Sequence, residues 1–183
     1  MLKLRQLLLA LTLTLVLPVL SFGQSDFPSS FPDPDGKIET KYDRFEDKTS
    51  VSLRFLGVAH DDVHWLYVSA DSKYDGQLAR KHPASVTLSF QSISLLGYSY
   101  PSLCRLDALV DGKPVPLGNF TRLDGQIMLG KYVEIIARQV DYDTFVRLVK
   151  ARTLEMRLEK TEFEFTDKQI GKLLAFANLL WVG

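Results

Sequence analysis

The chain has 183 residues with 22 basic and 22 acidic side chains, so it carries no formal net charge. Its hydrophobic fraction of 46% is typical of a globular protein and excludes a disordered or collagen-like chain. Because the balanced charge offers no basic surface to a phosphate backbone, no nucleic-acid partner is expected. The single cysteine, Cys104, excludes an intramolecular disulfide and a multi-cysteine zinc or iron–sulfur site.

Residues 1–23 have the pattern of a secretory signal peptide. Two basic residues begin it, an apolar run follows over residues 7–20, and small residues then place the cleavage site before Gln24. The run is shorter than the ~20 apolar residues of a membrane span. We therefore expect a cleaved peptide and a periplasmic or secreted protein with no membrane span. The absence of paired cysteines favours a bacterial envelope over a secreted eukaryotic domain.

The remainder is predicted to be a short leader followed by one domain. Residues 24–37 are rich in proline and serine, which is typical of a flexible leader. We find no internal repeat and no second boundary, so residues 38–183 are predicted to form a single domain.

Alternation of apolar and polar residues predicts a series of β-strands. The predicted strands are residues 38–43, 51–55, 63–70, 86–91, 104–110 and 132–136. Asp111-Gly112 is a strong signal for a two-residue hairpin turn. The segment that returns from this turn, residues 113–117, contains Pro114 and Pro116, and we therefore expect at best an edge strand there.

Two helices and a further hairpin are predicted in the last third of the chain. Asp141 can cap a helix over residues 142–150. Two alternating runs flank Lys160-Thr161 and predict a hairpin. Thr166 and Gln169 then form a capping box at the start of the last helix. The apolar stripe of that helix consists of Ile170, Leu173, Leu174, Ala177, Leu180 and Trp181.

The order of these elements indicates the fold class. Strands that are segregated from helices are typical of an α+β protein and not of a doubly wound α/β protein. We therefore predict an α+β domain with an antiparallel sheet of about six to eight strands and two helices packed on one face.

Two pairs of short motifs carry a family resemblance. The first pair is Tyr42-Asp43-x-Phe45 with Thr49 entering the next strand. The second is Glu155-x-Arg157 followed by Glu162-Phe163-x-Phe165 before the last helix. In these motifs the chain resembles a group of small exported bacterial proteins of unknown function. The resemblance implies an envelope location, no established activity and no catalytic residue. We expect Asp43 and Thr49 to bond backbone groups at the turn between the first two strands.

The histidines are the residues from which an active site could be built. His60, Asp62 and His64 lie close in sequence and are the candidates for a metal site or an acid–base pair. Their neighbours predict a strand, in which His60 and His64 would be ~13 Å apart and too distant to share one ion through bonds of ~2 Å. A turn at Asp61-Asp62 would bring the rings together, so a small metal-dependent or His/Asp acid–base hydrolase stays open as the alternative.

Motifs for a nucleophile or a cofactor are missing. The sequence has no Gly-x-Ser-x-Gly elbow and no Gly-rich phosphate loop, so we expect neither a catalytic serine nor a cofactor. Cys104 is in phase with apolar neighbours and is predicted to be a buried hydrophobic residue, with a reactive thiol as the alternative.

Residues 95–101 are the candidate binding segment. They combine two leucines and two tyrosines without the period of a strand or a helix. Tyrosines on loops often make partner contacts, although such a loop can also fold back and plug the end of a sheet. We therefore predict a non-enzymatic binding or interaction module in which Tyr98 and Tyr100 contact an unknown envelope protein or ligand.

Overall fold

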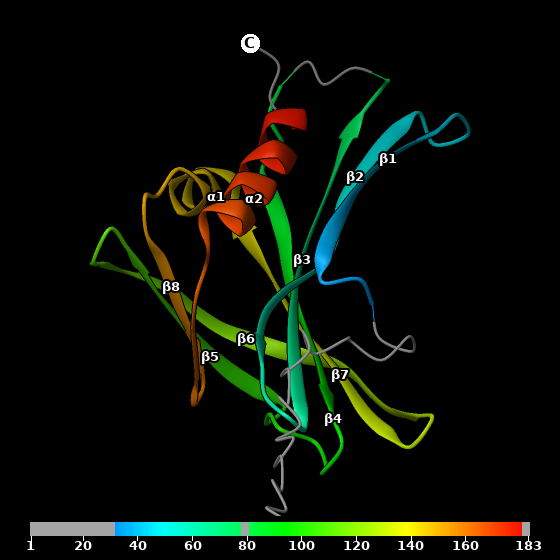
Figure 1. Cartoon of the computed structure of the whole chain (residues 1–183). Coiled ribbons are helices and arrows are strands. Elements are labelled where there is room, and N and C mark those ends of the chain that lie inside the picture. Colours follow the sequence, from blue (N-terminus) through cyan, green and yellow to red (C-terminus); the bar gives the residue numbers. More distant parts are fainter. Residues whose placement is uncertain (1–31, 78–80, 181–183) are drawn as a thin grey trace, which may run out of the picture. The chain divides into compact units, whose positions relative to one another are not determined.

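The computed structural model describes residues 32–77 and 81–180, so the predicted signal peptide and most of the predicted leader lie outside the described residues. Within them the chain forms one antiparallel sheet of nine strands and two short helices (Figure 1). The strands are β1 (Asp35–Asp43), β2 (Lys48–His60), β3 (His64–Asp75), β4 (Ser85–Ser94), β5 (Leu103–Val110), β6 (Lys113–Met128), β7 (Lys131–Asp141), β8 (Leu154–Leu158) and β9 (Thr161–Glu164). The helices are α1 (Tyr142–Val149) and α2 (Asp167–Leu179). The first strand begins inside the segment that the sequence predicts as a leader.

The strand order places one loop across the end of the sheet. The order is β1-β2-β3-β4-β7-β6-β5-β8-β9, and every neighbouring pair is antiparallel. Strand β5 follows β4 in sequence but lies beyond β7 and β6 in the sheet. The loop between β4 and β5 must therefore pass the ends of β7 and β6. This loop contains residues 95–101, the predicted binding segment.

The predicted fold class is wrong, because the described chain is mostly β. A single curled sheet of nine strands replaces the expected α+β arrangement of six to eight strands packed with two helices. In β2 and β6 the register shifts within the strand, between Leu53 and Leu56 and between Arg122 and Asp124. Each such bulge moves the following residues out of phase, so that a strict period of two no longer marks the strand.

Strand β6 shows how two prolines enter the interior of a sheet. The segment with Pro114 and Pro116 was expected to be an edge strand at best, yet β6 lies between β5 and β7. Its pairing with β5 includes both prolines, whereas its pairing with β7 begins only at Thr121. The prolines therefore lie in the part of β6 that has β5 on one side and no strand on the other. A proline nitrogen that points to the side without a strand costs the sheet no backbone hydrogen bond.

The helix caps and the turn between β1 and β2 follow the local sequence signals. The Asp141 carboxylate accepts a hydrogen bond from the Thr144 backbone N–H at the start of α1, and the capping box of Thr166 and Gln169 is present at the start of α2. Asp43 accepts from the backbone N–H of Phe45, and the Thr49 hydroxyl donates to the Gly76 carbonyl oxygen. The predicted role of Asp43 at the turn between β1 and β2 is thus confirmed, whereas Thr49 bonds a backbone group just beyond the end of β3 and not at that turn.

The core lies between the helices and the inner face of the curled sheet (Figure 1). Phe145 of α1 and Phe176 of α2 meet edge to face with ring centroids 5.8 Å apart, and both are fully buried. Leu174 belongs to the predicted apolar stripe of α2 but is only partly buried, whereas Phe176, which the predicted stripe omits, is fully buried. Trp181, the last residue of the predicted stripe, lies outside the described residues. The backbone N–H of Tyr142 bonds Ala84 O, which places α1 at the end of the sheet where β4 begins. The loop after β4 lies at the opposite end.

Candidate functional site

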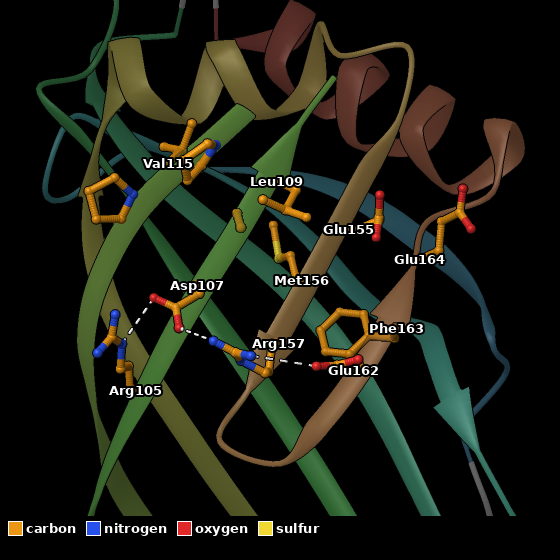
Figure 2. Close-up of a pocket in the computed structure, with 13 residues that line it drawn as sticks. Arg105, Asp107, Leu109, Val115, Glu155, Met156, Arg157, Glu162, Phe163 and Glu164 are labelled. Carbon is orange, nitrogen blue, oxygen red and sulfur yellow. Dashed lines mark hydrogen bonds and ion pairs between the residues drawn. The ribbon is translucent and has the colours of Figure 1, made fainter. Parts of the chain in front are cut away.

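A groove of about 800 Å³ lies on the face of the sheet that points away from the helices (Figure 2). In β5 the residues Leu106 and Ala108 are buried in the core, so the alternate residues Arg105, Asp107 and Leu109 point to the other face. The lining residues come from β5, β6, β8 and β9. They are Arg105, Asp107, Ala108, Leu109, Pro114, Val115, Pro116, Glu155, Met156, Arg157, Glu162, Phe163 and Glu164.

A row of ion pairs crosses this groove. Asp107 lies 3.0 Å from Arg105 and 3.0 Å from Arg157, and Arg157 lies 3.6 Å from Glu162 (Figure 2). The hydrogen bond from Arg157 is the main reason why the pKa of Asp107 is lowered, and the same bond raises the pKa of Arg157. The row is charge-balanced, with two cations and two carboxylates.

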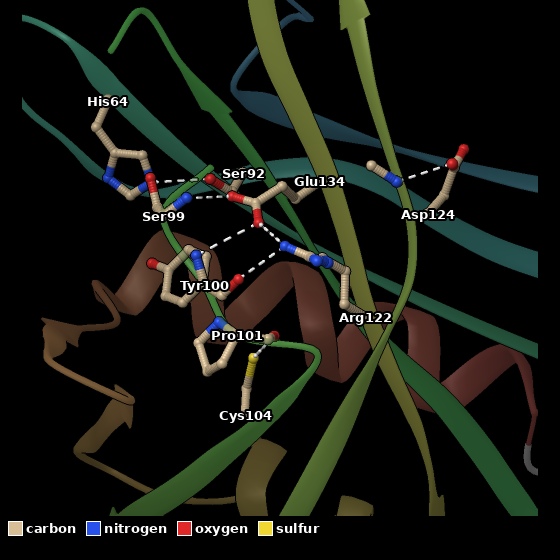
Figure 3. A network of polar contacts seen from close by, with 10 residues as sticks. His64, Ser92, Ser99, Tyr100, Pro101, Cys104, Arg122, Asp124 and Glu134 are labelled. Atoms are coloured by element: carbon tan, nitrogen blue, oxygen red, sulfur yellow. Dashed lines mark hydrogen bonds and ion pairs between the residues drawn. The ribbon is translucent and has the colours of Figure 1, made fainter. Parts of the chain in front are cut away.

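A buried polar network fixes the loop between β4 and β5, at the end of the sheet opposite to α1 (Figure 3). The Glu134 carboxylate of β7 is fully buried and accepts hydrogen bonds from the backbone N–H groups of Ser99 at 2.7 Å and Tyr100 at 3.3 Å. Arg122 of β6 donates to the Glu134 carboxylate at 3.1 Å and to the Tyr100 carbonyl oxygen at 2.9 Å. The two strands that the loop passes therefore hold it through one carboxylate and one guanidinium group.

The two predicted contact tyrosines lie in different environments. Tyr100 is only 5% exposed, its hydroxyl donates to Thr161 Oγ1 at 2.8 Å, and burial raises the pKa of Tyr100 to about 12. Tyr98 is 47% exposed and lies with its ring 5.2 Å from that of Tyr132. A Cβ atom at Gly125 would come within 3.3 Å of the Tyr98 ring, so this glycine allows the ring to lie over β6. Tyr100 offers little surface to a partner, and Tyr98 offers about half of its side chain.

The structure does not bring the candidate histidines together. His60 pairs with Trp65 and shares its face of the sheet, so the neighbouring His64 points to the other face. His64 Nε2 lies 3.0 Å from Ser92 Oγ, and burial lowers the pKa of His64. Asp61 accepts bonds from the His64 and Val63 backbone N–H groups and shapes the turn. Over residues 32–77 and 81–180, no group of three or more His, Cys, Asp or Glu side chains could hold a metal ion.

Cys104 holds the end of the same loop. It is fully buried, and its thiol donates to the Pro101 carbonyl oxygen at 3.1 Å. Burial raises the pKa of Cys104 to about 11, so the thiol stays protonated at neutral pH. A protonated, buried thiol is a poor nucleophile, and its position agrees with the prediction of a buried hydrophobic residue.

Exposed apolar side chains gather beyond the buried network, on the β4–β5 loop and the β6–β7 hairpin. We call these residues the apolar tip: Leu95, Leu96, Tyr98, Ile127, Met128 and Leu129. The register places the loop beside the hairpin, because Ser94 pairs with Tyr132 and Tyr132 pairs with Ile127. Leu129 is the most exposed, at 88%. The β6–β7 hairpin projects at the end of the sheet away from the helices (Figure 1).

The turn at the end of this hairpin has an unusual residue. Met128 pairs with Lys131, which leaves Leu129-Gly130 as a two-residue loop with φ angles of 50° and 74°. Such loops require positive φ at both positions and favour Asn, Asp or Gly at the first. The Asp111-Gly112 turn of the same chain has nearly the same φ angles and obeys this preference. Leu129 is a site residue that the alternation pattern does not predict, although a Gly preceded by an apolar residue between two apolar stretches marks this turn in the sequence.

Comparison with protein-family models, with curated protein sequences and with solved structures finds no match to this chain. Neither helix in the described part of the chain has the length and apolar composition that a membrane span requires. The apolar tip and the groove are therefore the two surfaces of the described chain from which a function can be inferred.

Proposed function

We propose that the protein is an exported, non-enzymatic binding module that contacts an envelope protein through the apolar tip. The exported location rests on the signal-peptide pattern of residues 1–23. The contact rests on one observation above all, which is Leu129 in the left-handed region with 88% of its side chain exposed.

The backbone of Leu129 supports this proposal. A non-glycine residue in the left-handed region costs ~1–2 kcal/mol, and Asn or Asp in that position relieves much of the cost. Leu129 also gains little from packing, since most of its side chain faces solvent. A local preference that is broken without a gain in packing points to selection for binding.

Preorganisation of the tip supports it as well. Glu134 and Arg122 bond the loop through its backbone, and the Tyr98 ring contacts Tyr132. A loop that is already ordered loses little conformational entropy when it meets a partner. Full burial of an aliphatic side chain contributes about 1.5–3 kcal/mol, so Leu96 and Leu129 together could supply several kcal/mol to an interface.

Site-specific photo-crosslinking in the cells that make the protein tests the proposal. A photoreactive amino acid at Leu129 or at Leu96 should yield a discrete crosslink to one protein, identified by mass spectrometry. The matched control is Phe45, which is 87% exposed on the turn between β1 and β2 and lies outside the tip. Equal crosslinking from Phe45, or crosslinking from the tip to lipid alone, would overturn the proposal.

A further inference from the structure

The strand register arranges the groove as two parallel rows of side chains. Each row contains one residue from each of β6, β5, β8 and β9, in that order across the sheet. The first row is Pro116, Asp107, Arg157 and Glu162. The second row is Pro114, Leu109, Glu155 and Glu164. Arg105 extends the charged part of the first row beside Asp107 (Figure 2).

The second row carries two negative charges that no ion pair within the described chain compensates. Glu155 and Glu164 are directly opposite each other on β8 and β9, and both are exposed. Neither has an ion-pair partner among the residues that the structure describes. Like charges directly opposite each other destabilise a pair of strands, and a cation placed between them removes that repulsion.

The same row carries an apolar surface next to these carboxylates. Leu109 precedes Glu155 in the row and is 38% exposed, and Pro114 lies beside Leu109 on β6. Four strands at a spacing of ~4.8 Å make the row about 14 Å long. The volume of about 800 Å³ lies in the range of small-molecule sites. The groove therefore has the size of a small ligand, with an anionic end and an apolar end.

We propose that this groove binds a small cationic amphiphile, with its ammonium or guanidinium group between Glu155 and Glu164 and its aliphatic body on Leu109 and Pro114. The neighbouring row neither attracts nor repels the ligand strongly, because its two arginines are already paired with Asp107 and Glu162. The site lies on other residues than the apolar tip and does not depend on the function proposed for the tip.

Three ligands of matched structure test this assignment by isothermal titration calorimetry or ligand-observed NMR. Hexylamine carries both the charge and the aliphatic body, hexanoate carries the body with the opposite charge, and methylamine carries the charge without the body. We expect saturable 1:1 binding of hexylamine, and binding at least about tenfold weaker for hexanoate and methylamine. Equal binding of hexanoate would show that charge does not select the ligand and would overturn the proposal.

Variants locate the site. Glu155→Gln with Glu164→Gln should weaken hexylamine binding about tenfold or more, whereas the exposed Glu46→Gln should leave it unchanged. Leu109→Asn should weaken hexylamine binding and leave that of methylamine unaltered. Thermal unfolding checks that each variant is folded. If the double variant fails to fold, hexylamine binding is measured instead with the single Glu164→Gln variant, whose change lies on the edge strand β9. The proposal would be overturned if hexylamine binding survived the glutamate changes. It would also be overturned if the groove bound a basic peptide but not hexylamine.

Discussion

Replacement of Leu129 by Asn should stabilise the protein while it weakens partner binding. Leu129 adopts a φ of 50° and is 88% exposed, so it bears the cost of the left-handed region without compensation from packing. Asn adopts this region readily, and the change should raise the free energy of unfolding by about 1 kcal/mol. For a domain of this size that corresponds to a rise in Tm of about 2–4 °C.

Urea and thermal unfolding of three proteins separate the backbone effect from the side-chain effect. Leu129→Asn removes both the strain and the apolar side chain, whereas Leu129→Ala removes the side chain and keeps a residue that disfavours positive φ. Only the Asn variant should gain stability, and both variants should reduce crosslinking from Leu96. A stability loss in Leu129→Asn would show that Leu129 packs in the fold, and an equal gain in Leu129→Ala would refute the backbone argument.

Three further changes test the buried polar groups. Glu134→Gln should lower the free energy of unfolding by about 2–4 kcal/mol in urea denaturation, because it removes the buried charge that pairs with Arg122 and replaces one of the two oxygens that accept backbone N–H groups with an amide donor. The exposed Glu39→Gln should cost less than about 0.5 kcal/mol. Tyr67→Phe should raise the free energy of unfolding by about 1 kcal/mol, because the buried Tyr67 hydroxyl has no hydrogen-bond partner among the described residues. Burial lowers the pKa of the half-buried His64 below its usual 6.5, so its contribution to stability is present above pH 6.5 and is lost as the pH falls from 6.5 through the lowered pKa of the folded state. Unfolding measured from about pH 7 to about pH 5 should therefore depend less on pH in His64→Gln.

Each of these changes has a contrary outcome. A neutral Glu134→Gln would mean that the loop is held mainly by its apolar contacts. A destabilising Tyr67→Phe would mean that the hydroxyl has a partner, and an unchanged pH profile in His64→Gln would place the titration elsewhere.

Local signals predicted most elements, because caps, turns and short alternation depend only on neighbouring residues. Asp141, Thr166 and Asp111-Gly112 all act within a few residues of their own position. The strand order depends on contacts between distant segments, and no local pattern indicates that β4 pairs with β7. The fold class was therefore beyond what the local pattern could determine.

The sites were harder to predict because each depends on a register. The sequence placed the last hairpin turn at Lys160-Thr161, whereas Leu158 pairs with Thr161 and the turn is Glu159-Lys160. A shift of one residue changes which side chains face each other, so the opposition of Glu155 and Glu164 could not be foreseen. Tyr98 and Tyr100 looked equivalent in sequence, and only the fixed loop separates an exposed ring from a buried one.

The strand order also has a consequence for folding kinetics. Strands β1 to β4 form one series of hairpins and β5 to β7 another, and the two series meet only where β4 pairs with β7. That pairing joins Ser94 to Tyr132 and Ser85 to Asp141, so, like the pairing of β5 with β8, it closes long loops and is expected to be slow. The apolar tip combines a loop that follows β4 with the hairpin that precedes β7. A chain that has folded only one series therefore presents half of the tip, so the proposed binding through the complete tip would distinguish finished molecules from intermediates.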